Sequence, residues 1–173
     1  MISASEIADG AKDWWSEARS NPLFWRGLLG GLVIAGLDQL SKYWIVHQIE
    51  LPARRKIEIS GIFDLTYVQN YGASFGMLHG SRVLLSMLSI TIALGLVYWL
   101  GQLRRIVAAS GVAFVIGGAL GNLYDRLAYG YVVDFLDFSG LMFPWVFNIA
   151  DAAINVGVAL LLLDAYQTRD KKD

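Results

Sequence analysis

The sequence predicts an all-α membrane protein, a bundle of four transmembrane helices. The chain has 173 residues, of which 55% are hydrophobic, and its mean hydropathy is +0.47. This composition is too apolar for an ordinary soluble domain of this size. A helix needs roughly 20 apolar residues to cross a bilayer. Four runs fit that length: about 27–46, 83–103, 106–124 and about 146–166.

The four runs differ in how many charges they carry. The second and third contain none, whereas the first contains Asp38 and Lys42. The fourth contains Asp151 and Asp164. Each run is expected to be helical, because backbone polar groups in a bilayer must be satisfied within the segment.

An even number of spans places both termini on one side of the membrane. That side, with the turn between the second and third runs, carries eight basic residues: Lys12, Arg19, Arg26, Arg104, Arg105, Arg169, Lys171 and Lys172. The other side carries five: Arg54, Arg55, Lys56, Arg82 and Arg126. The positive-inside rule therefore favours cytoplasmic termini.

The ends of the chain fall outside the membrane domain, which spans residues 23–168. Residues 1–22 are polar and contain Trp14 and Trp15, but they lack the apolar core of a signal peptide. We expect a cytoplasmic interfacial helix there, with the Trp pair at headgroup level. Residues 169–173 form a short cytoplasmic tail.

The loop at about 48–81 is the largest segment outside the bilayer. Residues 56–60 alternate between polar and apolar, and residues 62–68 do so approximately. This period predicts a small antiparallel sheet on the outer surface. Residues 70–76 follow, and their small side chains allow close approach of another backbone.

Composition excludes several kinds of chemistry. The net charge is −1, which gives no basic excess for nucleic acid, and cysteine is absent. The two histidines, His47 and His79, form no ligand-spaced pair, and no zinc-protease or Gly-x-Ser-x-Gly motif occurs. We expect neither a metal nor an organic cofactor. If the protein is a hydrolase, carboxylates are the best remaining catalysts.

Two aspartates, Asp134 and Asp151, are each flanked by apolar residues. Ionised carboxylates at membrane depth are costly and usually functional. These two are 17 positions apart, across a stretch that must turn back on itself. They could meet and share one proton, which suits acid–base chemistry on water. The alternative is that each caps a helix or pairs with a base.

Charge balance argues against that alternative. The one basic residue between the third and fourth spans is Arg126. It cannot neutralise all the acids of this region, which are Asp125, Asp134, Asp137 and Asp151. A shared proton would resolve the excess.

Other polar residues share helical faces with these acids. Asn122, Asp125 and Arg126 follow at i, i+3 and i+4. They either form a structural cluster, or Arg126 binds a substrate carbonyl or lipid headgroup while Asp125 orients it.

Further pairs are set by the same spacing. Asp38 and Lys42 are spaced for a structural ion pair. Asn148 and Asn155 lie on the Asp151 face of the fourth span, where they could bind its carboxylate or join helices. We expect Asp164 to be solvated and the histidines to be interfacial.

Five sequence blocks, in order, resemble the lipoprotein signal peptidases, the bacterial signal peptidase II family. The blocks are Asp38-Gln39-Leu40-Ser41-Lys42, Asn70-Tyr71-Gly72-Ala73-Ser74-Phe75-Gly76, Gly121-Asn122-Leu123-Tyr124-Asp125-Arg126, Val132-Val133-Asp134-Phe135 and Phe147-Asn148-Ile149-Ala150-Asp151. The resemblance runs from the first span to the fourth. Ser74 departs from the family's alanine, and residues 1–22 fall outside the resemblance.

The resemblance implies an intramembrane aspartyl endopeptidase of the inner membrane. It implies a diacylglyceryl-modified prolipoprotein substrate, cut before its lipid-bearing cysteine. The family's catalytic aspartates fall on Asp134 and Asp151. Its polar contacts to substrate and inhibitor fall on Asn70, Asn122, Arg126 and Asn148, and we expect small substrate residues to fit beside Gly72. The implied fold adds a periplasmic β-cradle and a short periplasmic helix, with Asp38, Lys42, Asp125 and Asn155 as structural polar residues.

Two rival hypotheses remain on the residues alone. A non-catalytic lipid-binding scaffold or carrier could use the same polar cluster to hold a headgroup or ion. A presenilin-type protease would need a Gly-x-Gly-Asp signature, which is absent, and more than four spans. The expected partners are lipidated prolipoproteins and membrane phospholipid, with no nucleic acid, and the expected state is a monomer.

Overall fold

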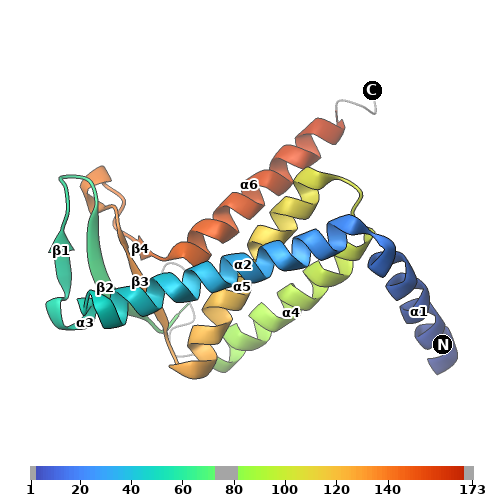
Figure 1. The fold of residues 1–173 in the computed structure, drawn as a ribbon, viewed down its shortest axis with the longest axis horizontal. Coiled ribbons are helices and arrows are strands. Elements are labelled where there is room, and N and C mark those ends of the chain that lie inside the picture. Colours follow the sequence, from blue (N-terminus) through green and yellow to red (C-terminus); the bar gives the residue numbers. More distant parts are fainter. Residues whose placement is uncertain (1–2, 73–81, 170–173) are drawn as a thin grey trace.

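Four helices of the computed structural model are long and apolar enough to span a membrane. The structure describes residues 3–72 and 82–169. The spanning helices are α2 (Pro22–Tyr43), α4 (Arg82–Gln102), α5 (Ile106–Ala128) and α6 (Ile149–Arg169), and a π-helical turn, Trp44–Gln48, extends α2. They form one bundle, with a small sheet at one end and both termini at the other (Figure 1). The four predicted spans are therefore present, each within a few residues of its expected limits.

Helix α5 is the centre of the bundle and packs against the other three spanning helices. Its inward faces are rich in Gly and Ala, which let neighbouring backbones approach closely. A Cβ added at Gly118 would overlap the carbonyl oxygen of Ala150 on α6. Lipid tails are as apolar as the side chains, so this close packing, rather than burial from water, holds the helices together.

The sheet has four antiparallel strands in the order β1-β2-β3-β4. Strands β1 (Lys56–Glu58) and β2 (Asp64–Asn70) come from the predicted loop, after a one-turn helix α3 (Leu51–Arg54). Strands β3 (Val132–Asp137) and β4 (Val146–Phe147) come from the connection between α5 and α6. The predicted antiparallel pair is therefore present, and β3 and β4 extend it from outside the 48–81 loop. Strand β3 escaped notice because nearly all its residues are buried, so its sequence does not alternate.

An apolar core fixes the sheet to the bundle. It contains Ile45, Leu51, Leu65, Val133 and Phe135, all buried. Burial of one large aliphatic side chain from water contributes about 1.5–3 kcal/mol. The sheet therefore holds a defined position over the ends of α5 and α6, where β3 and β4 lead into and out of the helices.

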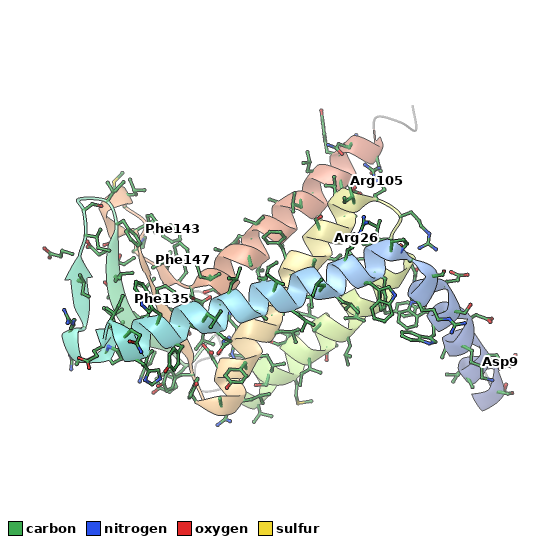
Figure 2. All side chains as sticks on the ribbon, viewed as in Figure 1. Asp9, Arg26, Arg105, Phe135, Phe143 and Phe147 are labelled. Carbon is green, nitrogen blue, oxygen red and sulfur yellow. The ribbon has the colours of Figure 1, made fainter. Side chains whose placement is uncertain are left out.

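The connection between β3 and β4 contains a three-residue 3-10 helix, Ser139–Leu141. This is the region in which the family resemblance implies a short helix. Apolar side chains of the β3–β4 connection are unusually exposed, with Met142 at 95% and Phe143 at 44%. Phe143 and Phe147 lie beside the sheet, far from Arg26 and Arg105 at the other end of the bundle (Figure 2).

The N-terminal segment forms helix α1 (Ala4–Ser20), which begins with a capping box between Ser3 and Glu6. It leaves the bundle at the end away from the sheet (Figure 1). Trp14 attaches α1 to the bundle, because its Nε1 donates to the Tyr98 carbonyl at 3.0 Å and its ring stacks on that of Tyr98. Trp15 remains 45% exposed. The predicted headgroup-level position thus suits Trp15 better than Trp14.

The close contact between α5 and α6 yields a testable expectation. Gly118→Ala should lower the free energy of unfolding by about 1–3 kcal/mol, because the new methyl group must push the two helices apart. The control is Gly95→Ala on α4, where an added Cβ meets nothing within 4 Å. Thermal unfolding in detergent measures both. Equal melting temperatures for the two variants would contradict the packing described above.

Candidate active site

The fold brings Asp134 and Asp151 to the same residue, Asn148. Asp134 lies on β3 and is 1% exposed, and Asp151 lies in the first turn of α6. Asn148 Nδ2 donates to Asp134 Oδ1 at 2.6 Å, and the Asn148 backbone N–H donates to Asp151 Oδ2 at 3.4 Å. One asparagine therefore bonds both carboxylates, which places them side by side.

Asp151 is held by the start of α6. Asn148 precedes the helix, and its Oδ1 accepts a hydrogen bond from the Asp151 backbone N–H at 2.9 Å. The Asp151 carboxylate accepts from the Asn148 backbone N–H in return, so the two form a reciprocal N-terminal cap. The helix dipole favours a carboxylate here. The capping alternative considered for Asp151 is thus present, and it fixes the carboxylate beside Asp134.

Asp134 is buried between two amide donors. Asn70 Nδ2 on β2 donates to its Oδ2 at 2.9 Å, and Asn148 donates to its Oδ1. Burial and the negative charge of Asp151 raise the pKa of Asp134, the two amide bonds oppose them, and the net result is a pKa of about 7. In the described part of the chain no cation pairs with Asp134, so the alternative of a structural ion pair does not apply. This carboxyl group can hold a proton near neutral pH.

Asn122 and Arg126, one turn apart on α5, border the two carboxylates. Asn122 Nδ2 donates to Asp151 Oδ1 at 2.8 Å. Arg126 is half-buried, interacts electrostatically with both carboxylates, and donates through Nη2 to the Gly72 carbonyl at 3.2 Å. Gly72 also donates its N–H to Asn70 Oδ1 at 3.0 Å. The residues on the α5 face therefore link Asp134 and Asp151, called the dyad below, to the end of β2.

A buried ion triad lies behind Asn122. Lys42 Nζ is 2.7 Å from Asp38 Oδ2 and 2.8 Å from Asp125 Oδ2, and all three side chains are nearly inaccessible. Lys42 also donates to Asn122 Oδ1 at 3.2 Å, as does Asn148 Nδ2 at 3.1 Å. Because the oxygen of Asn122 is held by these donors, its Nδ2 must face Asp151.

Comparisons with known proteins decide the family. The family model described as signal peptidase (SPase) II matches residues 31–167. The chain belongs to the signal peptidase II family.

Individual relatives agree with this assignment. The lipoprotein signal peptidase of Caulobacter vibrioides is 49% identical over 140 residues, covering 79% of this chain and 83% of that one. That of Gloeothece citriformis is 45% identical over 150 residues, covering 86% and 91%. A bacterial membrane enzyme solved in meso at 2.3 Å is similar with a TM-score of 0.78 and 27% identity, over 86% of this chain and 92% of that one.

Membership of the signal peptidase II family makes the chain a multi-pass membrane peptidase. It removes the ground for the rival hypothesis of a non-catalytic scaffold, and for a presenilin-type protease. The expectation of a site without metal stays a prediction. In residues 3–72 and 82–169, no group of three or more His, Asp or Glu side chains could hold a metal ion.

The acids near Arg126 are balanced differently from what the sequence suggested. Asp125 is neutralised by Lys42 from the first span, and Asp137 accepts from Thr66 Oγ1 at 2.6 Å and lies 3.8 Å from Lys56. These bases lie outside the segment between the third and fourth spans, in which Arg126 is the basic residue. Asp125 also points to Lys42 and Gln39 and does not orient Arg126. Unlike these acids, Asp134 and Asp151 form no ion pair among the described residues and are bonded by amide groups instead.

Two other expectations change in the peptidase structure. Asn155 is exposed and donates to the Asp151 backbone carbonyl at 3.0 Å, so it does not touch the carboxylate. Asp164 was expected to be solvated but pairs with Arg105 at 2.9 Å. His47 is exposed and packs against Tyr43, whereas His79 and the expected small residues Ala73 and Ser74 lie outside the described residues.

Sequence reasoning missed Gln39. Its Nε2 donates to Asp125 Oδ1 at 2.8 Å and to the Gly121 carbonyl at 3.1 Å, so it joins α2 to α5 beside the ion triad. A signal was available, because an amide side chain within a spanning segment usually bonds a neighbouring helix. Asn148 changes role as well. It is fully buried and bonds both aspartates, so it positions them, and its contact with substrate stays a prediction.

The raised pKa of Asp134 predicts how stability depends on pH. The folded protein keeps a proton up to about pH 7 that the unfolded chain releases near the ordinary pKa of 3.8. The contribution of Asp134 to the free energy of unfolding therefore falls as pH rises across that interval. Asp134→Asn should flatten the fall in melting temperature between about pH 4 and about pH 8. Asp9→Asn, at an exposed site on α1, is the control. An unchanged pH slope in Asp134→Asn would show that this carboxyl ionises normally.

Proposed function

We propose that this chain is an intramembrane aspartyl endopeptidase that removes signal peptides from diacylglyceryl-modified prolipoproteins, cutting before the lipid-bearing cysteine. Family membership supports the substrate class. The observation that carries the aspartyl mechanism is the bonding of both Asp134 and Asp151 to Asn148. Two carboxyl groups in one low-dielectric site share a proton, and such a pair is suited to hydrolysis of an amide.

The environments of the two carboxyl groups support an assignment of their starting roles. Burial, together with the charge of Asp151, raises the pKa of Asp134 to about 7, so this group can hold a proton. Asp151 lies at a helix N-terminus and accepts bonds from Asn122 Nδ2 and the Asn148 backbone N–H, which favour its ionised form. We therefore assign Asp151 as the base and Asp134 as the acid of the pair.

The reaction follows from these roles. Asp151 removes a proton from a water molecule as its oxygen attacks the scissile carbonyl carbon, and Asp134 donates its proton to the carbonyl oxygen. When the tetrahedral intermediate collapses, Asp134 takes back the hydroxyl proton and Asp151 gives its proton to the leaving nitrogen. The C–N bond breaks, and both carboxyl groups return to their starting states.

The orientation follows from the charges and the arrangement of the ends. Strand β3 and the first turn of α6, which carry Asp134 and Asp151, lie at the sheet end of the bundle, opposite both termini (Figure 1). The termini and the turn near them carry eight of the basic residues, against five on the sheet side. With the positive side in the cytoplasm, the sheet faces the periplasm and the dyad meets substrates at the outer leaflet of the inner membrane. Acyl chains of the substrate would remain in the bilayer beside the bundle.

The dyad is tested by Asp134→Asn and Asp151→Asn. Each should lower cleavage of a lipidated precursor by about 10²–10⁴-fold or more, because a general acid or base is lost while the shape is kept. The assay uses purified protein in detergent and follows release of the signal peptide. Asn155→Ala, one turn from Asp151 but turned away from its carboxylate, is the matched control. Full cleavage by either Asn variant would remove that residue from the mechanism.

Arg126 is expected to act on substrate through its position beside the dyad. Arg126→Ala should reduce kcat/KM by about 10–100-fold, as expected for one charge-assisted hydrogen bond. Arg126→Lys should recover part of the loss, because it restores the charge without the planar fork. Kinetics and thermal unfolding are measured together. A variant that cleaves normally but melts earlier would show that Arg126 serves only to hold Gly72.

A further inference from the structure

A cavity lies against the face of the sheet that is turned away from Asp134 and Asp151. It has a volume of about 680 Å³ and lies between α2, α5 and strands β2 and β3. Neither Asp134 nor Asp151 lines it. Side chains alternate across a strand, so Tyr131 and Val133 face this cavity while Asp134 faces the dyad. The cavity is therefore a separate feature from the two aspartates.

The walls of this cavity are unusually rich in tyrosine. Five of its thirteen lining residues are tyrosines: Tyr43, Tyr67, Tyr124, Tyr129 and Tyr131. Tyr124 and Tyr129 stand nearly perpendicular, at an interplanar angle of 77° with ring centroids 6.3 Å apart. The Tyr129 ring is 6.3 Å from that of Tyr131, whose hydroxyl lies 3.5 Å from that of Tyr67. Rings arranged at angles to one another expose electron-rich faces, which is how proteins bind alkylammonium groups.

The charges at the floor of the cavity favour the same kind of ligand. Lys42 and Asp125 line it, and Lys42 is paired with Asp38 as well as with Asp125. Two carboxyl groups, those of Asp38 and Asp125, face this single ammonium group. His47 at the rim is the other titratable base of the lining. Two acidic groups against one base beneath aromatic walls favour a cation over an anion.

The cavity opens toward lipid. Leu40, Tyr43 and Tyr124 belong to its lining and are 67%, 57% and 53% exposed, although they lie on membrane-spanning helices. Exposed side chains on such helices face the bilayer. Tyrosines at the end of a span occupy the headgroup level, and Gly36 and Leu40 extend the cavity toward the hydrocarbon. The occupant must therefore have a polar head and an apolar tail.

We propose that this tyrosine-lined cavity binds an aminophospholipid, with the ammonium of an ethanolamine headgroup between the tyrosine rings. Hydroxyl groups of the tyrosines nearer the membrane surface would bond the phosphate, and an acyl chain would follow α2 past Leu40 and Gly36. The site is independent of the peptidase dyad. It would seat a resident lipid against β3, on the face opposite Asp134.

Native mass spectrometry of the full chain tests this proposal. The protein is purified in mild detergent and mixed with equal amounts of phosphatidylethanolamine and phosphatidylglycerol that carry the same acyl chains. We expect about five- to tenfold more bound phosphatidylethanolamine, which corresponds to one desolvated cation–π contact. The wild-type experiment needs no variant to fold. Equal binding of the two lipids, preference for phosphatidylglycerol, or no retained lipid would each overturn the proposal.

A variant then places the lipid in this cavity. Tyr124→Leu with Tyr129→Leu removes two exposed rings and should bring the preference close to one. Tyr166→Leu on α6, 67% exposed and outside the cavity, is the matched control and should keep the preference. Thermal unfolding of each protein confirms that it is folded. A preference that survives in the double variant would overturn the assignment to this site.

Discussion

The structure depends on one buried cation, the ammonium group of Lys42. Its two carboxylate partners each bond a second element: Asp38 Oδ1 accepts from the Ala150 backbone N–H of α6 at 2.9 Å, and Asp125 Oδ2 accepts from the Val133 N–H of β3 at 3.1 Å. One ion triad thus fixes α2 and α5 to the two elements that carry the dyad. Breaking one partner of a buried pair leaves an uncompensated charge, at a cost of about 3–5 kcal/mol. The polar residues of the spans are therefore the frame of the active site.

The dyad itself is held by neutral groups. Asn70, Asn122 and Asn148 supply the side-chain donors to the two carboxylates. An amide fixes the position of a carboxylate without adding the full charge that would force both acids to ionise. Arg126, a cation at the rim, is turned to the Gly72 carbonyl. In the proposed mechanism, this division keeps a proton on the pair and leaves a positive group beside it for substrate.

The sequence located the two proposed catalytic aspartates because acids with apolar neighbours cost free energy in a membrane chain and are therefore rare. It misjudged how the neighbouring acids are balanced. Asp125 and Asp137 find their bases in Lys42 and Lys56, which are far away along the chain. It also missed β3, since a strand buried on both faces has no alternating pattern. Gln39 went unnoticed for a related reason: a single amide has no spacing that shows what it bonds.

By itself, the sequence determined the four spans, the polar residues within them and the hairpin of β1 and β2. Bilayer thickness sets helix length, and strand period is local, so both can be read from neighbouring residues. Only the tertiary structure decided that β3 completes the sheet, that Lys42 orients Asn122, and that one asparagine joins the two aspartates. These contacts connect residues from separate helices and strands. Their partners are chosen by packing and by the need to satisfy every buried polar group, which no local pattern records.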